Sequence, residues 1–280
     1  MGVFPLFWSD WYPNGKTRHA GVVVHCCMGT ERITFENHAG QQLAGRFDTP
    51  DAQPSGYALF AHCFTCSKDT LAASRIARGL TERGIAVLRF DFTGLGESEG
   101  AFDATSFASN VRDLLSACAW VDEHHAPVDL LIGHSLGGAA VVSAAGQMDG
   151  VKGVATIGAP SDPTHVRHLF ESHIEEIERE GSAEVSIGGR PFRIGKAFLD
   201  DLDAHDPREI LRGLKRPLMI FHSPIDQIVG VENAAQMFEW AMHPKSFVSL
   251  DKADHMLTNR KDADFVAAMI TAWSGRVLDA

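Results

Sequence analysis

The chain has 280 residues, of which 45% are apolar, and a formal net charge of −11. This length suits one large α/β domain or two small ones, and the apolar fraction allows a sizeable core. The acidic balance argues against binding to nucleic acid or to an anionic membrane surface, because both need a basic face. No apolar run approaches the roughly 20 residues that a membrane-spanning helix needs.

Residues 1–28 precede the first regular pattern and are predicted to be an N-terminal extension of uncertain order, before a domain over 29–280. The segment has no basic region before an apolar block and no small-residue cleavage site, so it does not match a signal peptide. The five cysteines are an odd, sparse set for a chain of this length, which argues against a disulfide framework. We therefore expect a reducing, cytoplasmic setting.

Strand and helix patterns alternate along the rest of the chain. Strands are predicted at 32–36, 42–47, 57–61, 85–92, 128–133, 153–158, 217–222 and 246–251. Apolar residues at helical spacing predict helices at 72–80, 107–118, 136–145 and 265–273. Near-continuous apolar strands separated by helices indicate a mostly parallel sheet with helices on both faces, an α/β fold.

One stretch, residues 161–216, interrupts this alternation. It contains an acidic helical pattern at 168–180, a hairpin pattern that turns at Gly188-Gly189, and a polar helical pattern at 198–214. A structureless loop of this length is uncommon in a compact domain. We predict a small cap inserted over one end of the sheet.

The sequence "IGHSLGG" (132–138) is a G-x-S-x-G motif between a predicted strand and a predicted helix. In this context the turn is tight, so Gly133 and Gly137 must carry no side chain, and the Ser135 hydroxyl stands clear of the sheet. The turn also aims the Leu136 N–H at the same spot, which would make it one donor of an oxyanion hole. Ser135 is the candidate nucleophile.

A serine hydroxyl needs a base to act as a nucleophile near neutral pH. His255 and Asp226 both lie in loops that follow predicted strands, at the edge of a parallel sheet where ligands bind. The order Ser135, Asp226, His255 along the chain is that of α/β hydrolases. Asp251 and Asp254 are too close to His255 in sequence to reach its Nδ1, so Asp226 is the candidate acid.

The stretch "AHCFTCSKD" (61–69) places Cys63 and Cys66 as a C-x-x-C between a strand and a helix. Thioredoxin-like redox sites have this layout. The same loop is also where a hydrolase of this kind needs an oxyanion donor, and we favour that interpretation. A lowered pKa of Cys66 near the helix start stays open.

Five motifs together carry a family resemblance, which extends over about residues 30–278. They are "AHCFTCSKD", "RFDFTGLGESEG", "IGHSLGG", "HSPIDQIV" and "DKADHML". The set resembles serine hydrolases of the α/β-hydrolase superfamily, in particular the hydrolase module often fused to an OsmC-like domain and small cinnamoyl or feruloyl esterases.

The resemblance implies an α/β-hydrolase fold with a small cap insertion. It also implies roles for residues in the loop after the third strand. It implies that Phe64 supplies the second oxyanion N–H and that His62 braces its loop. The chain departs from the family pattern at Cys63, where Gly is usual. If that position needs a positive φ, we expect backbone strain there.

The expected function is a serine esterase that acts on a small-molecule ester through Ser135, His255 and Asp226, without metal or organic cofactor. We expect neither nucleic-acid nor membrane binding. Three alternatives stay open: a thioesterase or C–C bond hydrolase with the same triad, a thiol redox or peroxide-defence module using Cys63 and Cys66, and a ligand-binding relative without turnover.

Overall fold

The computed structural model describes residues 29–278. An eight-stranded sheet runs through it in the order β1-β2-β4-β3-β5-β6-β9-β10. The strands are β1 (Gly29–Glu36), β2 (Gln42–Thr49), β3 (Gly56–Ala61), β4 (Ile85–Phe90), β5 (Leu130–His134), β6 (Gly153–Ile157), β9 (Leu218–His222) and β10 (Lys245–Ser249). β2 pairs antiparallel with β1 and β4, and every other pair in this sheet is parallel. The predicted mostly parallel sheet is confirmed.

The burial of each strand follows its sequence pattern. β4, β5, β6 and β9 are buried at every position, as their continuous apolar runs predict for strands covered on both faces. β1 instead alternates between exposed and buried residues towards its end, where Ile33 and Phe35 face the core. The parallel strands therefore form a rigid centre whose carboxyl ends meet at one edge.

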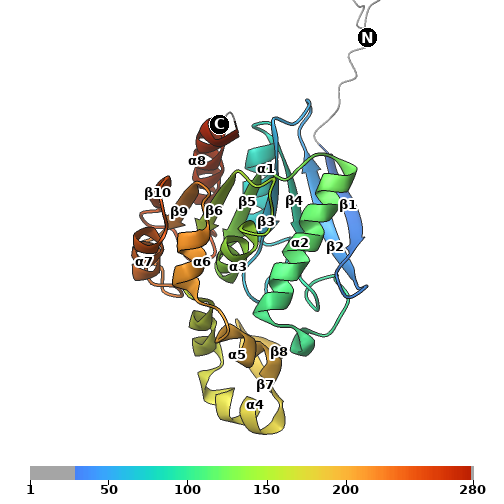
Figure 1. Ribbon diagram of the computed structural model, residues 1–280, viewed down its shortest axis with the longest axis vertical. Coiled ribbons are helices and arrows are strands. Elements are labelled where there is room, and N and C mark those ends of the chain that lie inside the picture. The colour runs from blue at the N-terminus through green and yellow to red at the C-terminus, as the bar shows by residue number, and fades with distance from the viewer. Residues whose placement is uncertain (1–28, 279–280) are drawn as a thin grey trace, which may run out of the picture.

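Helices cover both faces of the sheet (Figure 1). α1 (Leu71–Thr81) and α8 (Arg260–Leu278) share one apolar core, and α2 (Phe107–His124) and α3 (Leu136–Ala145) contribute to the other. α1 begins where the Thr70 side chain accepts the Ala73 N–H. A further helix, α7 (Glu232–Trp240), was not predicted; it buries only two residues, Ala234 and Met237.

The chain between β6 and β9, here called the cap, folds into short elements. They are the 3₁₀ turns η2 (Pro163–Leu169) and η3 (Glu171–His173), helix α4 (Ile174–Glu180), strands β7 (Ser182–Ile187) and β8 (Arg190–Gly195), and helices α5 (Lys196–Leu202) and α6 (Pro207–Gly213). In Figure 1 the β7–β8 hairpin, α4 and α5 project beyond one end of the sheet. The hairpin turns at Gly188-Gly189, where both φ angles are positive.

Two predicted cap helices differ from those observed. The single helix expected over 168–180 is broken at Phe170, whose extended φ of −142° separates two short 3₁₀ turns, and only α4 is α-helical. The helix expected over 198–214 is two helices, because Asp206 caps a new one that starts at Pro207. In the second case a local capping signal outweighs apolar periodicity.

Two further points concern the extent of the chain. No helix within residues 29–278 has the length and apolarity to cross a bilayer. The N-terminal extension predicted over residues 1–28 falls outside the residues that the structure describes.

Candidate active site

Ser135 stands at the turn between β5 and α3 in a strained backbone conformation, with φ 54° and ψ −128°. Such angles are rare for a residue with a side chain and persist only where the surroundings enforce them. Here the Ser135 N–H donates to the Ile157 carbonyl at 2.9 Å, and the Ser135 carbonyl accepts the Gly138 N–H at 2.8 Å. The turn thus holds the half-buried hydroxyl above the carboxyl edge of the sheet.

The two glycines of the motif are required by the packing of backbone on backbone. A Cβ at Gly137 would collide with the carbonyl oxygens of Ala61 and His62, at the end of β3. A Cβ at Gly133 would collide with the Gly137 carbonyl in the first turn of α3. The helix can therefore approach β3 only because both positions lack a side chain.

The structure brings Ser135, His255 and Asp226 into one hydrogen-bonded chain. His255 Nε2 lies 3.1 Å from Ser135 Oγ, and His255 Nδ1 lies 2.8 Å from Asp226 Oδ2. His255 comes from the loop after β10, and Asp226 from the loop after β9. Since Nδ1 faces a carboxylate it carries the ring proton, which leaves Nε2 free to accept the hydroxyl proton.

Asp226 is held as an anion at a fixed orientation. Burial alone would raise the pKa of its carboxyl, but hydrogen bonds from His255 and from the Val229 and Ile228 N–H groups lower the pKa below its ordinary value. The two other carboxylates near His255 in sequence are engaged elsewhere. Asp254 bonds Thr258, and Asp251 bonds Ser249.

Two buried histidines support this chain, and sequence reasoning missed both. The His134 ring donates from Nε2 to the His255 carbonyl at 2.7 Å, and the His222 ring donates from Nε2 to the Val229 carbonyl at 2.8 Å. Burial, followed by the neighbouring His255, lowers the pKa of His134 to about 3, so the ring is neutral. Both residues adjoin the motifs, which was a usable signal.

The loop after β3 forms a tight turn over Cys63–Cys66. The Cys66 N–H donates to the Cys63 carbonyl at 3.1 Å, and the two sulfurs are joined in a disulfide. This pairing was not predicted. The condition set for strain at Cys63, a positive φ, is not met, because the positive φ of this turn, 58°, falls on Thr65 instead. Thr65 occupies the turn position that normally selects Gly or Asn.

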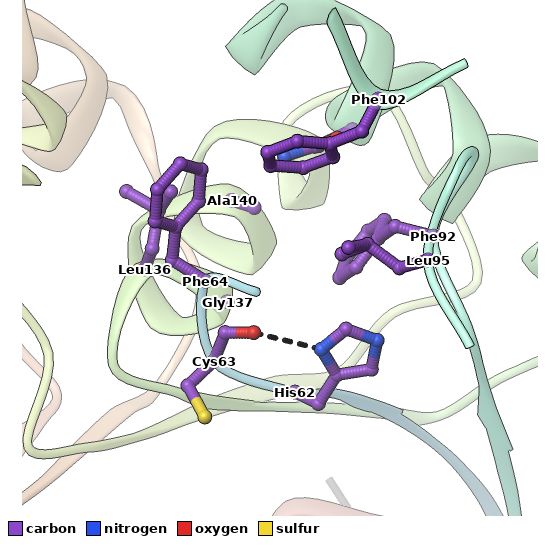
Figure 2. Close-up of a pocket in the computed structure, with 10 residues that line it drawn as sticks. His62, Cys63, Phe64, Phe92, Leu95, Phe102, Leu136, Gly137 and Ala140 are labelled. Carbon is purple, nitrogen blue, oxygen red and sulfur yellow. Dashed lines mark hydrogen bonds between the residues drawn. The ribbon is translucent and has the colours of Figure 1, made fainter. Parts of the chain in front are cut away.

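Three contacts hold this turn in place. The His62 ring donates from Nδ1 to the Cys63 carbonyl at 2.8 Å, a bond drawn in Figure 2, so His62 does contact the loop that it was predicted to brace. The Lys68 N–H and ammonium group both bond the fully buried Asp91, at 2.6 Å each. On the outer side Arg190, at the start of β8 in the cap, donates to the Thr65 carbonyl.

The Phe64 and Leu136 N–H groups have no hydrogen-bond acceptor among residues 29–278. Phe64 is the residue after Cys63 in the turn, and Leu136 is the first residue of α3. Both residues line one small cavity, seen in Figure 2 with Phe64, Leu136 and Ala140 on one side and Phe92 and Leu95 on the other. Its remaining walls are His62, Cys63, Phe102, Asn110 and Gly137.

Four phenylalanines from separate segments pack together beside the cavity. The centroid of the Phe64 ring lies 5.5 Å from that of Phe102 and 5.2 Å from that of Phe198 in α5. The Phe102 centroid lies 5.6 Å from that of Phe192 in β8. The space left is about 10 Å³, room for about one water molecule. Among the described residues, no group of three or more His, Cys, Asp or Glu side chains is arranged to hold a metal ion.

The fold is that of α/β hydrolases. The model of the alpha/beta hydrolase family matches residues 58–269, and the chain belongs to that family. The esterase domain of a Rhodothermus marinus protein is 53% identical, with a TM-score of 0.75 over 90% of this chain and all of that one.

More distant relatives share the family or the fold. The uncharacterized protein YfhR of Salmonella typhi is 27% identical over 81% of this chain and 74% of its own length. The mitochondrial palmitoyl-protein thioesterase ABHD10 of Mus musculus is 26% identical over 85% of this chain and 79% of its own. Est1E of Butyrivibrio proteoclasticus, solved with ferulic acid, has a TM-score of 0.73 at 18% identity over 89% of this chain and all of that one, and so shares the fold.

Gly137→Ala is expected to destabilise the protein by about 1–3 kcal/mol, because the added Cβ forces the backbone of α3 away from β3. Gly146→Ala, at the other end of α3, is the matched control. It has no atom within 4 Å of the added Cβ and a helical φ of −68°, so its stability should be unchanged or slightly higher. Urea unfolding of both variants measures this, and equal stabilities would contradict the packing argument.

His134→Gln is expected to reduce the loss of stability at acid pH. The ordinary pKa of the histidine is 6.5 and the folded value is about 3, so between these values the unfolded chain binds a proton that the folded chain excludes. Stability therefore falls as pH drops below 6.5, and this single group accounts for about 2 kcal/mol at pH 5. Urea unfolding at pH 7 and pH 5 should show a smaller difference for His134→Gln than for the wild type or for the exposed control His38→Gln.

Proposed function

We propose that the chain is a serine esterase that hydrolyses small-molecule carboxylic esters through a covalent acyl-enzyme. The observation that carries the proposal is the unbroken hydrogen-bond chain from Ser135 Oγ to His255 and from His255 to Asp226. The 53% identity to a chain described as an esterase domain supports ester hydrolysis as the reaction. The reaction needs no metal or organic cofactor.

In the proposed first half-reaction, Ser135 Oγ attacks the ester carbonyl carbon while its proton passes to His255 Nε2. The carbonyl oxygen becomes an oxyanion, which accepts hydrogen bonds from the free Phe64 and Leu136 N–H groups. Asp226 stabilises the imidazolium that forms. When the tetrahedral intermediate collapses, the bond to the alcohol oxygen breaks and His255 returns the proton to that oxygen.

The second half-reaction repeats the sequence with water. His255 takes a proton from water as the oxygen attacks the acyl carbon. When the bond to Ser135 Oγ breaks, His255 returns that proton to Oγ and the acid leaves. Each oxyanion donor of this kind is worth about 2.7–4 kcal/mol of transition-state stabilisation. The contacts of His62, Lys68 and Arg190 with the loop that carries Phe64 supply the required rigidity.

A thioesterase or C–C bond hydrolase would use the same residues. The name of the mouse relative, a palmitoyl-protein thioesterase, favours the thioester as a second substrate class. The cavity beside Phe64, with room for about one water molecule, argues against a palmitoyl chain in this protein. Parallel assays with acetyl and palmitoyl thioesters separate these possibilities.

The disulfide between Cys63 and Cys66 favours a second function of another class, thiol redox chemistry. In that reaction the two thiols reduce a peroxide ROOH to ROH and water, and close to the disulfide. Cys63 is buried and Cys66 half-buried, which limits access to one sulfur. The disulfide lies in the loop that the esterase mechanism needs, so its structural role is sufficient to explain it.

Ser135→Ala is expected to lower kcat for p-nitrophenyl acetate by at least about a thousandfold, since removing the nucleophile leaves only binding and the oxyanion donors. A fluorophosphonate probe should label the wild type and not this variant, as mass spectrometry of the intact protein would show. Ser143→Ala, on the same helix, is the control and should keep both properties. Turnover by folded Ser135→Ala would refute the nucleophile assignment.

A double variant, Cys63→Ser with Cys66→Ser, separates the two candidate functions. We expect it to keep ester hydrolysis within about tenfold of the wild type, because the Cys66 N–H bond to the Cys63 carbonyl and the three supporting contacts remain. The measurements are p-nitrophenyl acetate hydrolysis and thiol-dependent peroxide consumption. Peroxide consumption by the wild type, lost in the variant, would establish the redox function instead.

A further inference from the structure

Several large apolar side chains are exposed close to the proposed triad. Ile225 and Ile228 are 52% and 46% exposed and flank Asp226, while Met256 is 37% exposed and follows His255. Leu71, at the start of α1, is 56% exposed. Only three other large apolar residues within 29–278 are exposed to this degree. Four of the seven therefore lie beside the site.

The fold brings these four residues, here called the apolar rim, to the edge of the sheet that holds Ser135. Ile225, Ile228 and Met256 belong to the two loops that deliver the acid and the base. Leu71 lies one turn before Arg75, whose guanidinium donates to the Thr258 carbonyl at 2.7 Å. The start of α1 is therefore next to the loop that carries His255 and Met256.

The side of Ser135 that carries Phe64 and Leu136 offers little space. The cavity beside these two residues leaves room for about one water molecule, and the Phe64 ring packs against the rings of Phe102 and Phe198. A group of one or two carbon atoms can occupy such a space. A longer chain would have to displace aromatic side chains that the cap holds in place.

The chemistry of the proposed reaction assigns the two sides to the two halves of an ester. The carbonyl oxygen would lie between the Phe64 and Leu136 N–H groups, so the acyl chain, bonded to the same carbon, would pass close to these two residues, which also line the cavity. The leaving oxygen must receive its proton from His255 Nε2, so the alcohol portion leaves on the His255 side. Met256 of the apolar rim directly follows His255 in the chain.

We propose that the preferred substrates are esters of a short acyl group, acetyl or propionyl, with a larger apolar alcohol whose carbon chain lies on the apolar rim. This inference rests on the proposed esterase function and names the substrate class of the same site. A fully buried methylene changes affinity about fourfold, so a chain half covered on an open rim should gain about twofold per methylene.

Two isomeric esters test the proposal without a difference in composition. Hexyl acetate places six carbons in the alcohol, and ethyl hexanoate places six in the acyl group. The wild-type enzyme should show at least about tenfold higher kcat/KM on hexyl acetate. Along alkyl acetates from ethyl to hexyl, kcat/KM should rise about twofold per methylene, through KM.

Variants of the rim locate the effect. Ile225→Thr and Met256→Gln should each lower the ratio of kcat/KM for hexyl acetate to that for ethyl acetate by about threefold, mainly by raising KM for the hexyl ester. Met242→Gln is the matched control, since Met242 is 60% exposed but precedes β10, at the opposite edge of the sheet. It should leave the ratio at the wild-type value.

The outcomes distinguish this inference from the proposed function. A higher kcat/KM on ethyl hexanoate, or no dependence on alcohol length, overturns the inference, provided that Ser135→Ala abolishes the hydrolysis. An unchanged ratio in both rim variants also overturns it. Hydrolysis that survives Ser135→Ala, or none on any ester including p-nitrophenyl acetate, overturns the proposed function as well.

Discussion

The site depends on one close contact between two stretches of backbone. The first turn of α3 lies directly against the carbonyls of Ala61 and His62, with no side chain between them, because Gly137 has none. Leu136 is the residue before Gly137. Phe64 lies two residues after His62, in the loop that follows β3. Backbone packing thus places both free N–H groups, and the side chains of His62, Lys68 and Arg190 hold the turn that carries Phe64. The same contact carries Ser135, so the proposed nucleophile and oxyanion donors keep one fixed geometry.

Two neutral, buried histidines support this geometry behind His255 and Asp226, and a buried ion pair supports it beneath the Phe64 turn. His134 and His222 sit behind His255 and Asp226 as neutral donors, since burial lowers the pKa of each ring. They orient the loops without adding positive charge that would compete with the imidazolium form of His255. Beneath the Phe64 turn, Lys68 and the buried Asp91 form an ion pair at 2.6 Å. A buried pair is costly to break, which makes the base of that loop stiff.

The strands, the helices and the positions of Ser135, Asp226 and His255 could be predicted because each leaves a local signal in the sequence. Continuous apolar runs give the parallel strands, and Gly-x-Ser-x-Gly between a strand and a helix gives Ser135. The remaining features depend on contacts between distant segments. The positive φ of Thr65 is stabilised by Arg190, 125 residues further along the chain. The role of His134 requires the His255 carbonyl, and α7 fully buries only two residues. Sequence periodicity carries no information on such pairs.

The bond from Arg190 to the Thr65 carbonyl has a consequence for how such a fold diversifies. Cap insertions sit between two strands and look like modules that can be exchanged to change substrate range. In this protein the cap hairpin also restrains the turn that carries Phe64, and α5 supplies Phe198 against the Phe64 ring. A graft of another cap would therefore alter the reaction centre as well as the entrance. A successful chimera would have to keep an arginine at the place of Arg190, because the backbone carbonyl that it bonds is present whatever residue stands at 65.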